Sequence, residues 1–157
     1  MRDPDDIRNF LRLDDRITTS GRLLLGDPAR LAAIGVRHVV NLALDSHAEA
    51  LPDEAALLAE HGVRYTHIPI PFDAPTEDHY RAFRAAIEAD DTPVHVHCIM
   101  NWRVSALFYR YNRDEAGMAE PDARALMERI WNPANSDYPG AAAWADLISD
   151  KSKGEDA

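Results

Sequence analysis

The stretch that decides the fold is residues 93–105, Pro93-Val94-His95-Val96-His97-Cys98-Ile99-Met100-Asn101-Trp102-Arg103-Val104-Ser105. Residues 94–97 alternate β-branched and polar side chains, which predicts a strand with two valines on one face and two histidines on the other. The apolar run at 104–111 then predicts a helix. Cys98, the only cysteine of the chain, therefore lies between the end of a strand and the start of a helix.

This position favours a reactive thiolate at Cys98. Unpaired amides and the positive end of the helix dipole stabilise a sulfur anion, and the same amides can hold an oxyanion or phosphate. Arg103 follows about one helical turn later and would add a fixed positive charge. A lone cysteine after a strand is usually a small buried apolar residue, but with these neighbours Cys98 becomes a candidate for chemistry or anion binding.

Length and composition limit the class of protein. A chain of 157 residues predicts one domain over residues 1–150, with a disordered tail at 151–157. One cysteine excludes an internal disulfide framework and fits a reducing compartment. Residues 1–6 lack the apolar core of a signal peptide, and no apolar run is long enough to cross a bilayer, so we expect a cytoplasmic protein. The net charge of −10 argues against nucleic acid or an anionic membrane as a partner, but a small anion remains compatible with it.

The sequence predicts an α/β fold in which strands and helices alternate. The predicted strands are 16–20, 36–44, 63–70 and 94–97. The predicted helices begin at Asp27 as the N-cap, near Asp53, after Thr76 as the N-cap, and at Val104; two more, 121–131 and 140–148, form a C-terminal extension after Asp114. Residues 1–15 are expected to be a loosely packed lead-in. Short connections between these elements imply a mainly parallel central sheet flanked by helices.

Asp73 is the candidate acid that belongs with Cys98. Both residues follow the ends of predicted strands, and in parallel sheets the functional sites lie at the carboxyl ends of strands. Asp78 is the alternative, although a place in the first turn of the next helix suits it better. His95 and His97 share a strand face, but two such ligands are too few for a metal site, so neither a metal nor another cofactor is expected.

The chain resembles the cysteine-dependent protein tyrosine phosphatase superfamily, specifically its small dual-specificity-like branch of bacterial proteins. The resemblance covers roughly residues 10–113 and is carried, in order, by Thr18-Thr19-Ser20-Gly21, by GVRHVVNLAL at 35–44, by GVRYTHIPIPFDAP at 62–75, and by His97-Cys98. It implies a dual-specificity-phosphatase-like fold and the hydrolysis of a phosphomonoester, on a protein or a small molecule, through a phosphocysteine.

The resemblance also implies a role for each site residue. Cys98 would attack phosphorus, Arg103 would bind two phosphate oxygens, and Asp73 would protonate the leaving alcohol and later activate water. His97 would hold the loop and favour the thiolate. The remaining phosphate oxygens would meet the loop that contains Ile99, Met100, Asn101, Trp102 and Val104, and Ser105 would hydrogen-bond the departing sulfur.

One spacing departs from the pattern of the superfamily. Five residues separate the cysteine and the arginine there, whereas four separate Cys98 and Arg103. Asn101 occupies the place of the central glycine, and asparagine tolerates the left-handed conformation that such a turn needs. One residue fewer removes an amide from the loop and about 3.5 Å of chain.

The shorter loop keeps two other functions open. A rhodanese-type sulfurtransferase has a loop of this length, which suits a persulfide, although the opening strand and Gly-His-Ile motif of rhodaneses are missing. A phospho-group binding module without turnover is the second alternative, and Trp102 could stack on an aromatic ligand there. The sequence leaves the physiological substrate, the role of the C-terminal extension and the oligomeric state open.

Overall fold

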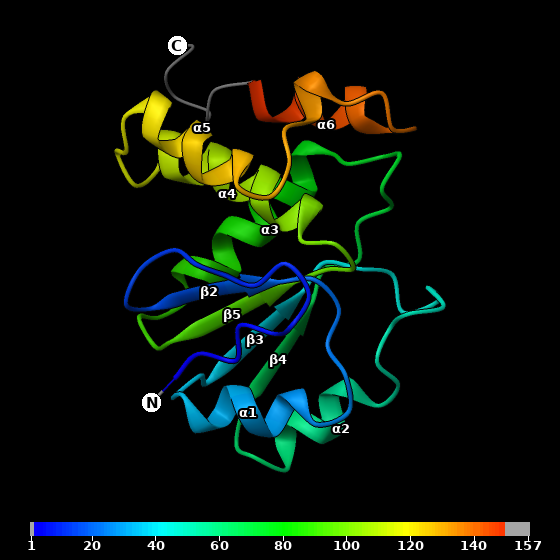
Figure 1. The fold of residues 1–157 in the computed structure, drawn as a ribbon, viewed down its shortest axis with the longest axis vertical. Helices are drawn as coiled ribbons and strands as arrows, with labels where there is room; N and C mark the ends of the chain where they lie inside the picture. The colour runs from blue at the N-terminus through cyan, green and yellow to red at the C-terminus, as the bar shows by residue number, and fades with distance from the viewer. Residues whose placement is uncertain (1, 150–157) are drawn as a thin grey trace.

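A five-stranded sheet forms the centre of the molecule in the computed structural model, which describes residues 2–149 (Figure 1). The strands are β1 (Leu11–Arg12), β2 (Ile17–Ser20), β3 (His38–Asn41), β4 (Arg64–His67) and β5 (Val94–His97), in the order β1-β2-β5-β3-β4. Strands β2 to β5 are parallel, and β1 joins β2 antiparallel. The prediction of a mainly parallel sheet is confirmed; the tail expected at 151–157 lies outside the described residues.

Helices cover both faces of this sheet, as Figure 1 shows. On one face lie α1 (Asp27–Ala33) and α2 (Glu54–Ala59); on the other lie α3 (Glu77–Glu88), α4 (Trp102–Asp114), α5 (Glu120–Glu128) and α6 (Ala141–Ser149). A short 3-10 helix, η1 (Pro133–Asn135), precedes α6. No helix in the described part of the chain combines the length and apolar character that crossing a membrane requires.

Strand β5 has the two-faced pattern that its sequence predicts. Val94, Val96 and Cys98 belong to the apolar core under the larger helical layer. On the opposite face, His95 has both ring nitrogens 2.8 Å from hydroxyl groups, those of Thr18 and Ser20 on the neighbouring strand. Ser20 on β2 and Asn41 on β3 are the register partners of His97, so the three strands end at the same edge and Cys98 lies there.

The expectation of a loosely packed lead-in at residues 1–15 is wrong, because the described part of this segment, residues 2–15, is packed. Ile7 and Leu11 are buried, and the backbone oxygen of Arg8 accepts a 2.7 Å hydrogen bond from the amide of Gly21. The Arg8 guanidinium also donates to the backbone oxygen of Ile99, at 3.3 Å. The segment thus contacts the loop after β5, about 90 residues further along the chain.

Two predicted helix starts also need correction. Gly26, not Asp27, is the N-cap of α1, because the Asp27 carboxylate accepts a hydrogen bond from the preceding Leu24 amide at 2.7 Å. Helix α4 begins at Trp102, two residues before the predicted start at Val104. The predicted cap of α3 is confirmed, since the Thr76 hydroxyl accepts from the His79 amide at 3.3 Å.

Candidate active site

The loop from Cys98 to Asn101 joins β5 directly to α4, and Asn101 makes this short connection possible. Asn101 has φ 67° and ψ 8°, the left-handed conformation predicted from its place in the motif. Its side-chain nitrogen donates to the backbone oxygen of Asn9 at 2.8 Å and to the Thr19 hydroxyl at 3.0 Å. These hydrogen bonds attach the turn to β2 and to the N-terminal segment.

The backbone amides of this loop are unpaired. Within residues 2–149, the amides of 99–104 donate no hydrogen bond, whereas those of Cys98 and Ser105 on either side donate to Ser20 and Asn101. The last three of these amides belong to the first turn of α4, where no intrahelical acceptor exists. Six consecutive free donors at a helix N-terminus form a suitable environment for an anion.

The loop after β5 passes so close to Gly21 that this position has no room for a side chain. A Cβ at this position would lie 2.4 Å from the backbone oxygen of Ile99, so a larger residue would displace the loop. The same Ile99 oxygen accepts a 2.9 Å hydrogen bond from the Arg22 amide. This close approach explains the glycine in the Thr18-Thr19-Ser20-Gly21 segment that carries part of the resemblance.

Arg103 is a buried cation without a carboxylate partner. The residue is 8% exposed, and its Nη1 donates to the backbone oxygen of Ile70 at 2.9 Å. Its guanidinium carbon lies 5.7 Å from the centre of the Phe72 ring. No acidic group among the described residues forms an ion pair with it, and a buried charge left unpaired in this way is costly unless a ligand supplies the opposite charge.

Cys98 and Arg103 line the same cavity, which has a volume of about 410 Å³. The other lining residues come from several parts of the chain: His47, Phe72, Ile99, Met100, Trp102 and Tyr138. Cys98 is 1% exposed, so its thiol lies at the floor. The volume is within the usual range for a small-molecule site, and the predicted convergence of thiol and guanidinium is present.

His97 is held from the opposite face of the sheet by Glu54, which the sequence did not single out. The His97 Nε2 lies 2.5 Å from a carboxylate oxygen of Glu54, and its Nδ1 lies 3.3 Å from the backbone oxygen of Cys98. Both ring nitrogens of His97 therefore lie beside oxygen atoms. Asn41 donates to the second carboxylate oxygen of Glu54 at 3.3 Å. Nothing in the sequence around Glu54, at the start of α2, links it to His97.

Asp73 lies in the turn directly after Phe72 and is exposed to solvent. The turn is closed by the Ala74 amide, which donates to the backbone oxygen of Pro71 at 3.1 Å. Asp73 is not among the described residues that line the cavity, although Phe72 is. Asp78 occupies the first turn of α3, as expected, and its carboxylate pairs with Arg81.

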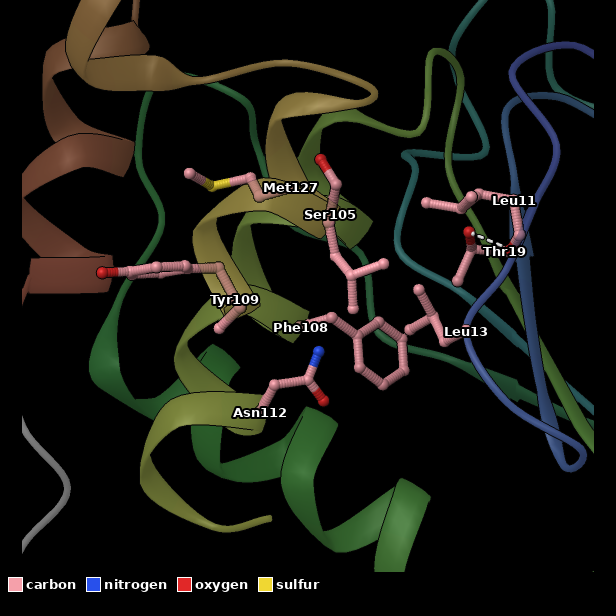
Figure 2. Close-up of a pocket in the computed structure, with 10 residues that line it drawn as sticks. Leu11, Leu13, Thr19, Ser105, Phe108, Tyr109, Asn112 and Met127 are labelled. Carbon is pink, nitrogen blue, oxygen red and sulfur yellow. Dashed lines mark hydrogen bonds between the residues drawn. The ribbon is translucent and has the colours of Figure 1, made fainter. Parts of the chain in front are cut away.

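Ser105 lines a different, smaller pocket between β1, α4 and α5, shown in Figure 2. Its hydroxyl donates to the backbone oxygen of Trp102 at 3.2 Å. This pocket measures about 10 Å³, room for about one water molecule, and Thr19 and Phe108 also line it. Val104 is completely buried in the main core.

His47 and Tyr138 are cavity residues that the sequence did not indicate. His47 lies in the connection between β3 and α2, and its Nδ1 accepts a hydrogen bond from the Glu49 amide at 2.9 Å. Tyr138 lies between η1 and α6, in the C-terminal extension. Neither lies near a motif, so only the three-dimensional arrangement brings them to Cys98.

Trp102 forms part of an aromatic wall. Its ring stacks on Trp131 with centres 4.8 Å apart and planes 9° apart. One face of Trp102 is therefore already covered by the extension. Among residues 2–149, no group of three or more His, Cys, Asp or Glu side chains is arranged to hold a metal ion.

Solved structures share this fold. A candidate phosphatase of the DUF442 group from Shewanella putrefaciens CN-32 is 29% identical, with a TM-score of 0.79, and the alignment covers 92% of this chain and 93% of that one. The core catalytic domain of the PP-IP phosphatase SIW14 from S. cerevisiae, solved with citrate, is 13% identical, with a TM-score of 0.73 and coverage of 95% and 88%. The second likeness concerns the fold alone.

Sequence comparison identifies the family. The beta-lactamase hydrolase-like protein of Agrobacterium fabrum (strain C58 / ATCC 33970) is 27% identical over 101 residues, which are 62% of this chain and 23% of that protein. The chain therefore matches less than a quarter of the relative's length. The model of the family "Beta-lactamase hydrolase-like protein, phosphatase-like domain" matches residues 9–110, which include the strand, the loop and the start of α4 described above. This chain belongs to that family of phosphatase-like domains.

Proposed function

We propose that this protein is a cysteine-dependent phosphatase that hydrolyses a phosphomonoester through a phosphocysteine intermediate. The observation that carries this proposal is Arg103, a buried guanidinium without a carboxylate partner in the described chain, in the same cavity as Cys98. Six unpaired amides follow Cys98. A phosphate group would satisfy the guanidinium through two oxygens and the amides through the others.

The reaction would proceed in two steps. The Cys98 sulfur attacks phosphorus while the bond from phosphorus to the ester oxygen breaks, and Asp73 gives its proton to the leaving oxygen. Water then attacks the phosphocysteine, Asp73 takes a proton from this water, and the sulfur–phosphorus bond breaks to release inorganic phosphate. This role of Asp73 is supported by its position in the loop after Phe72, a residue that lines the cavity.

Turnover of p-nitrophenyl phosphate tests the nucleophile and the arginine. The Cys98→Ser variant should show no turnover but should still bind inorganic phosphate in calorimetry, because Arg103 and the amides remain. Arg103→Ala should lose phosphate binding. Turnover by Cys98→Ser would overturn the proposed nucleophile, and phosphate binding without turnover by the wild type would identify a binding module. Sulfur transfer from thiosulfate without phosphatase activity would identify a sulfurtransferase.

A comparison of Asp73→Asn with His47→Asn tests the acid. General acid catalysis contributes about 10²–10⁴-fold, so Asp73→Asn should lower kcat for a phenyl ester by a factor in this range. His47→Asn should change kcat by less than about threefold, although His47 lines the cavity. A large loss of kcat in His47→Asn, with little change in Asp73→Asn, would instead identify His47 as the acid.

A further inference from the structure

Two of the most exposed apolar side chains lie at the mouth of the candidate active site. In the described chain, four large apolar residues are clearly exposed: Leu24, Leu25, Met100 and Tyr138. Met100 and Tyr138 both line the cavity of Cys98. Tyr138 is 53% exposed, and exposed apolar groups around a concave site indicate contact with a ligand.

The ring of Tyr138 is held in one orientation. It makes edge-on contacts with Trp102, at 5.1 Å between ring centres, and with Phe72, at 5.7 Å. Its backbone is fixed on both sides, since its amide donates to the Ser136 hydroxyl at 3.2 Å and its oxygen accepts from Ala141 at 3.0 Å. An aromatic group fixed before binding loses little conformational entropy when a ligand arrives.

The segment that carries Tyr138 is attached to the loop of the proposed acid. Trp144, which is fully buried, donates from Nε1 to the backbone oxygen of Phe72 at 2.6 Å. A Cβ on Gly140 would lie 2.9 Å from the Phe72 ring, so the two segments are in direct contact there. This part of the chain lies beyond the family match, which ends at residue 110.

The cavity therefore has two chemically different groups of lining residues. Cys98 and Arg103 suit an anion, whereas Phe72, Trp102 and Tyr138 form an aromatic surface beside them. A planar apolar group can contact such a surface through its face or its edge. A small alkyl group offers less area to the aromatic surface, and inorganic phosphate offers none.

We propose that Tyr138 is a specificity-determining residue, whose ring contacts the organic part of the substrate and favours phosphomonoesters of aromatic alcohols over alkyl esters. The inference rests on the proposed function, because it requires the phosphate group to bind Arg103 and the amides of residues 99–104. It assigns a role in substrate choice to the C-terminal extension, separate from the residues that carry out the reaction.

Calorimetry on the Cys98→Ser protein tests the inference without turnover. Phenyl phosphate and inorganic phosphate are titrated into Cys98→Ser, and into the same protein with Tyr138→Ala, Tyr138→Phe or Leu24→Ala added. Leu24 is the matched control, because it is 56% exposed and does not line the cavity. Thermal melting shows whether each variant is folded.

Tyr138→Ala should weaken binding of phenyl phosphate about three- to tenfold, the effect that one aromatic contact supplies. The affinity for inorganic phosphate should change less than twofold. Tyr138→Phe and Leu24→Ala should leave both affinities unchanged. Equal loss for both ligands, or no loss for phenyl phosphate, would overturn the role of Tyr138 while leaving the proposed function intact. Failure of Cys98→Ser to bind either ligand would overturn both proposals.

Discussion

The imidazole of His97, which precedes the candidate nucleophile, lies between two oxygen acceptors. Glu54 contacts one ring nitrogen from α2, and the backbone oxygen of Cys98 lies beside the other. These two contacts fix the orientation of the His97 ring directly before the candidate nucleophile. The sequence identified His97 but not Glu54, because 43 residues separate them and no local pattern connects them.

Replacing Glu54 with glutamine tests this arrangement. Glutamine preserves the size of the side chain but removes its charge, so its hydrogen bond with the His97 ring should weaken. We expect the melting temperature to fall and kcat/KM to fall about three- to tenfold, because the same ring contacts the backbone oxygen of Cys98.

Glu60→Gln is the control for this change, because Glu60 is an exposed carboxylate at the other end of the same helix. It should leave the melting temperature and kcat/KM unchanged. A lower melting temperature of Glu54→Gln with unchanged kcat/KM would mean that Glu54 contributes to stability alone.

At the scale of the elements, the central strands and the loop after β5 could be predicted from local sequence. The alternation at 94–97 gave the bounds of β5 correctly, and the asparagine at position 101 indicated the left-handed turn. The packing of Ile7 and Leu11 could not be predicted, because it depends on contacts with a loop about 90 residues away. Trp131 and Trp144 likewise lie beside Phe72, and no local pattern indicates this, because it depends on how α6 returns over the sheet.

Trp144 on α6 connects this helix to the 71–75 loop through its hydrogen bond with the backbone oxygen of Phe72. Trp144→Phe removes the donor to the Phe72 oxygen and leaves a buried acceptor unpaired, so the free energy of unfolding should fall by about 1–3 kcal/mol. Trp131→Phe is the matched control, because the buried Nε1 of Trp131 has no hydrogen-bond partner among the described residues. Both substitutions lose ring volume, so Trp131→Phe should destabilise the protein less than Trp144→Phe, which also loses a hydrogen bond.

Urea unfolding of both variants measures these effects. The Trp144→Phe midpoint should fall at an unchanged m-value, and kcat should fall with it, because the same contact holds the loop of Asp73. Equal destabilisation by both substitutions would mean that loss of ring volume, rather than the hydrogen bond, is responsible.

At the scale of the whole molecule, the candidate site is assembled from both helical layers of Figure 1. Glu54 reaches β5 from the layer of α1 and α2, whereas Arg103 and Tyr138 belong to the other side. The sheet between them carries buried polar side chains, so the stability of the whole molecule should depend on their protonation. His95, in the middle of β5, is the clearest case.

Burial holds the pKa of His95 well below its usual value of 6.5, and the neighbouring His97 adds to this effect. Above pH 6.5 the ring is neutral in the folded and unfolded chains, so its contribution to stability is constant. Below pH 6.5 the unfolded chain binds a proton that the folded chain does not, so the free energy of unfolding should fall with pH. The loss expected from this one group is at most about 1.4 kcal/mol between pH 7.5 and pH 5.5.

Urea unfolding at pH 7.5, 6.5 and 5.5 isolates this contribution when the wild type is compared with His95→Asn. The variant should be less stable at every pH, because asparagine fits the hydroxyls of Thr18 and Ser20 less well. Its stability should nevertheless change less between pH 7.5 and 5.5 than that of the wild type, by at most about 1.4 kcal/mol. His61→Asn, at an exposed position, should keep the pH dependence of the wild type. If His95→Asn showed the pH dependence of the wild type, His95 would have to bind its proton equally well in the folded and unfolded chains. The complete burial of its ring inside the sheet makes this unfavourable.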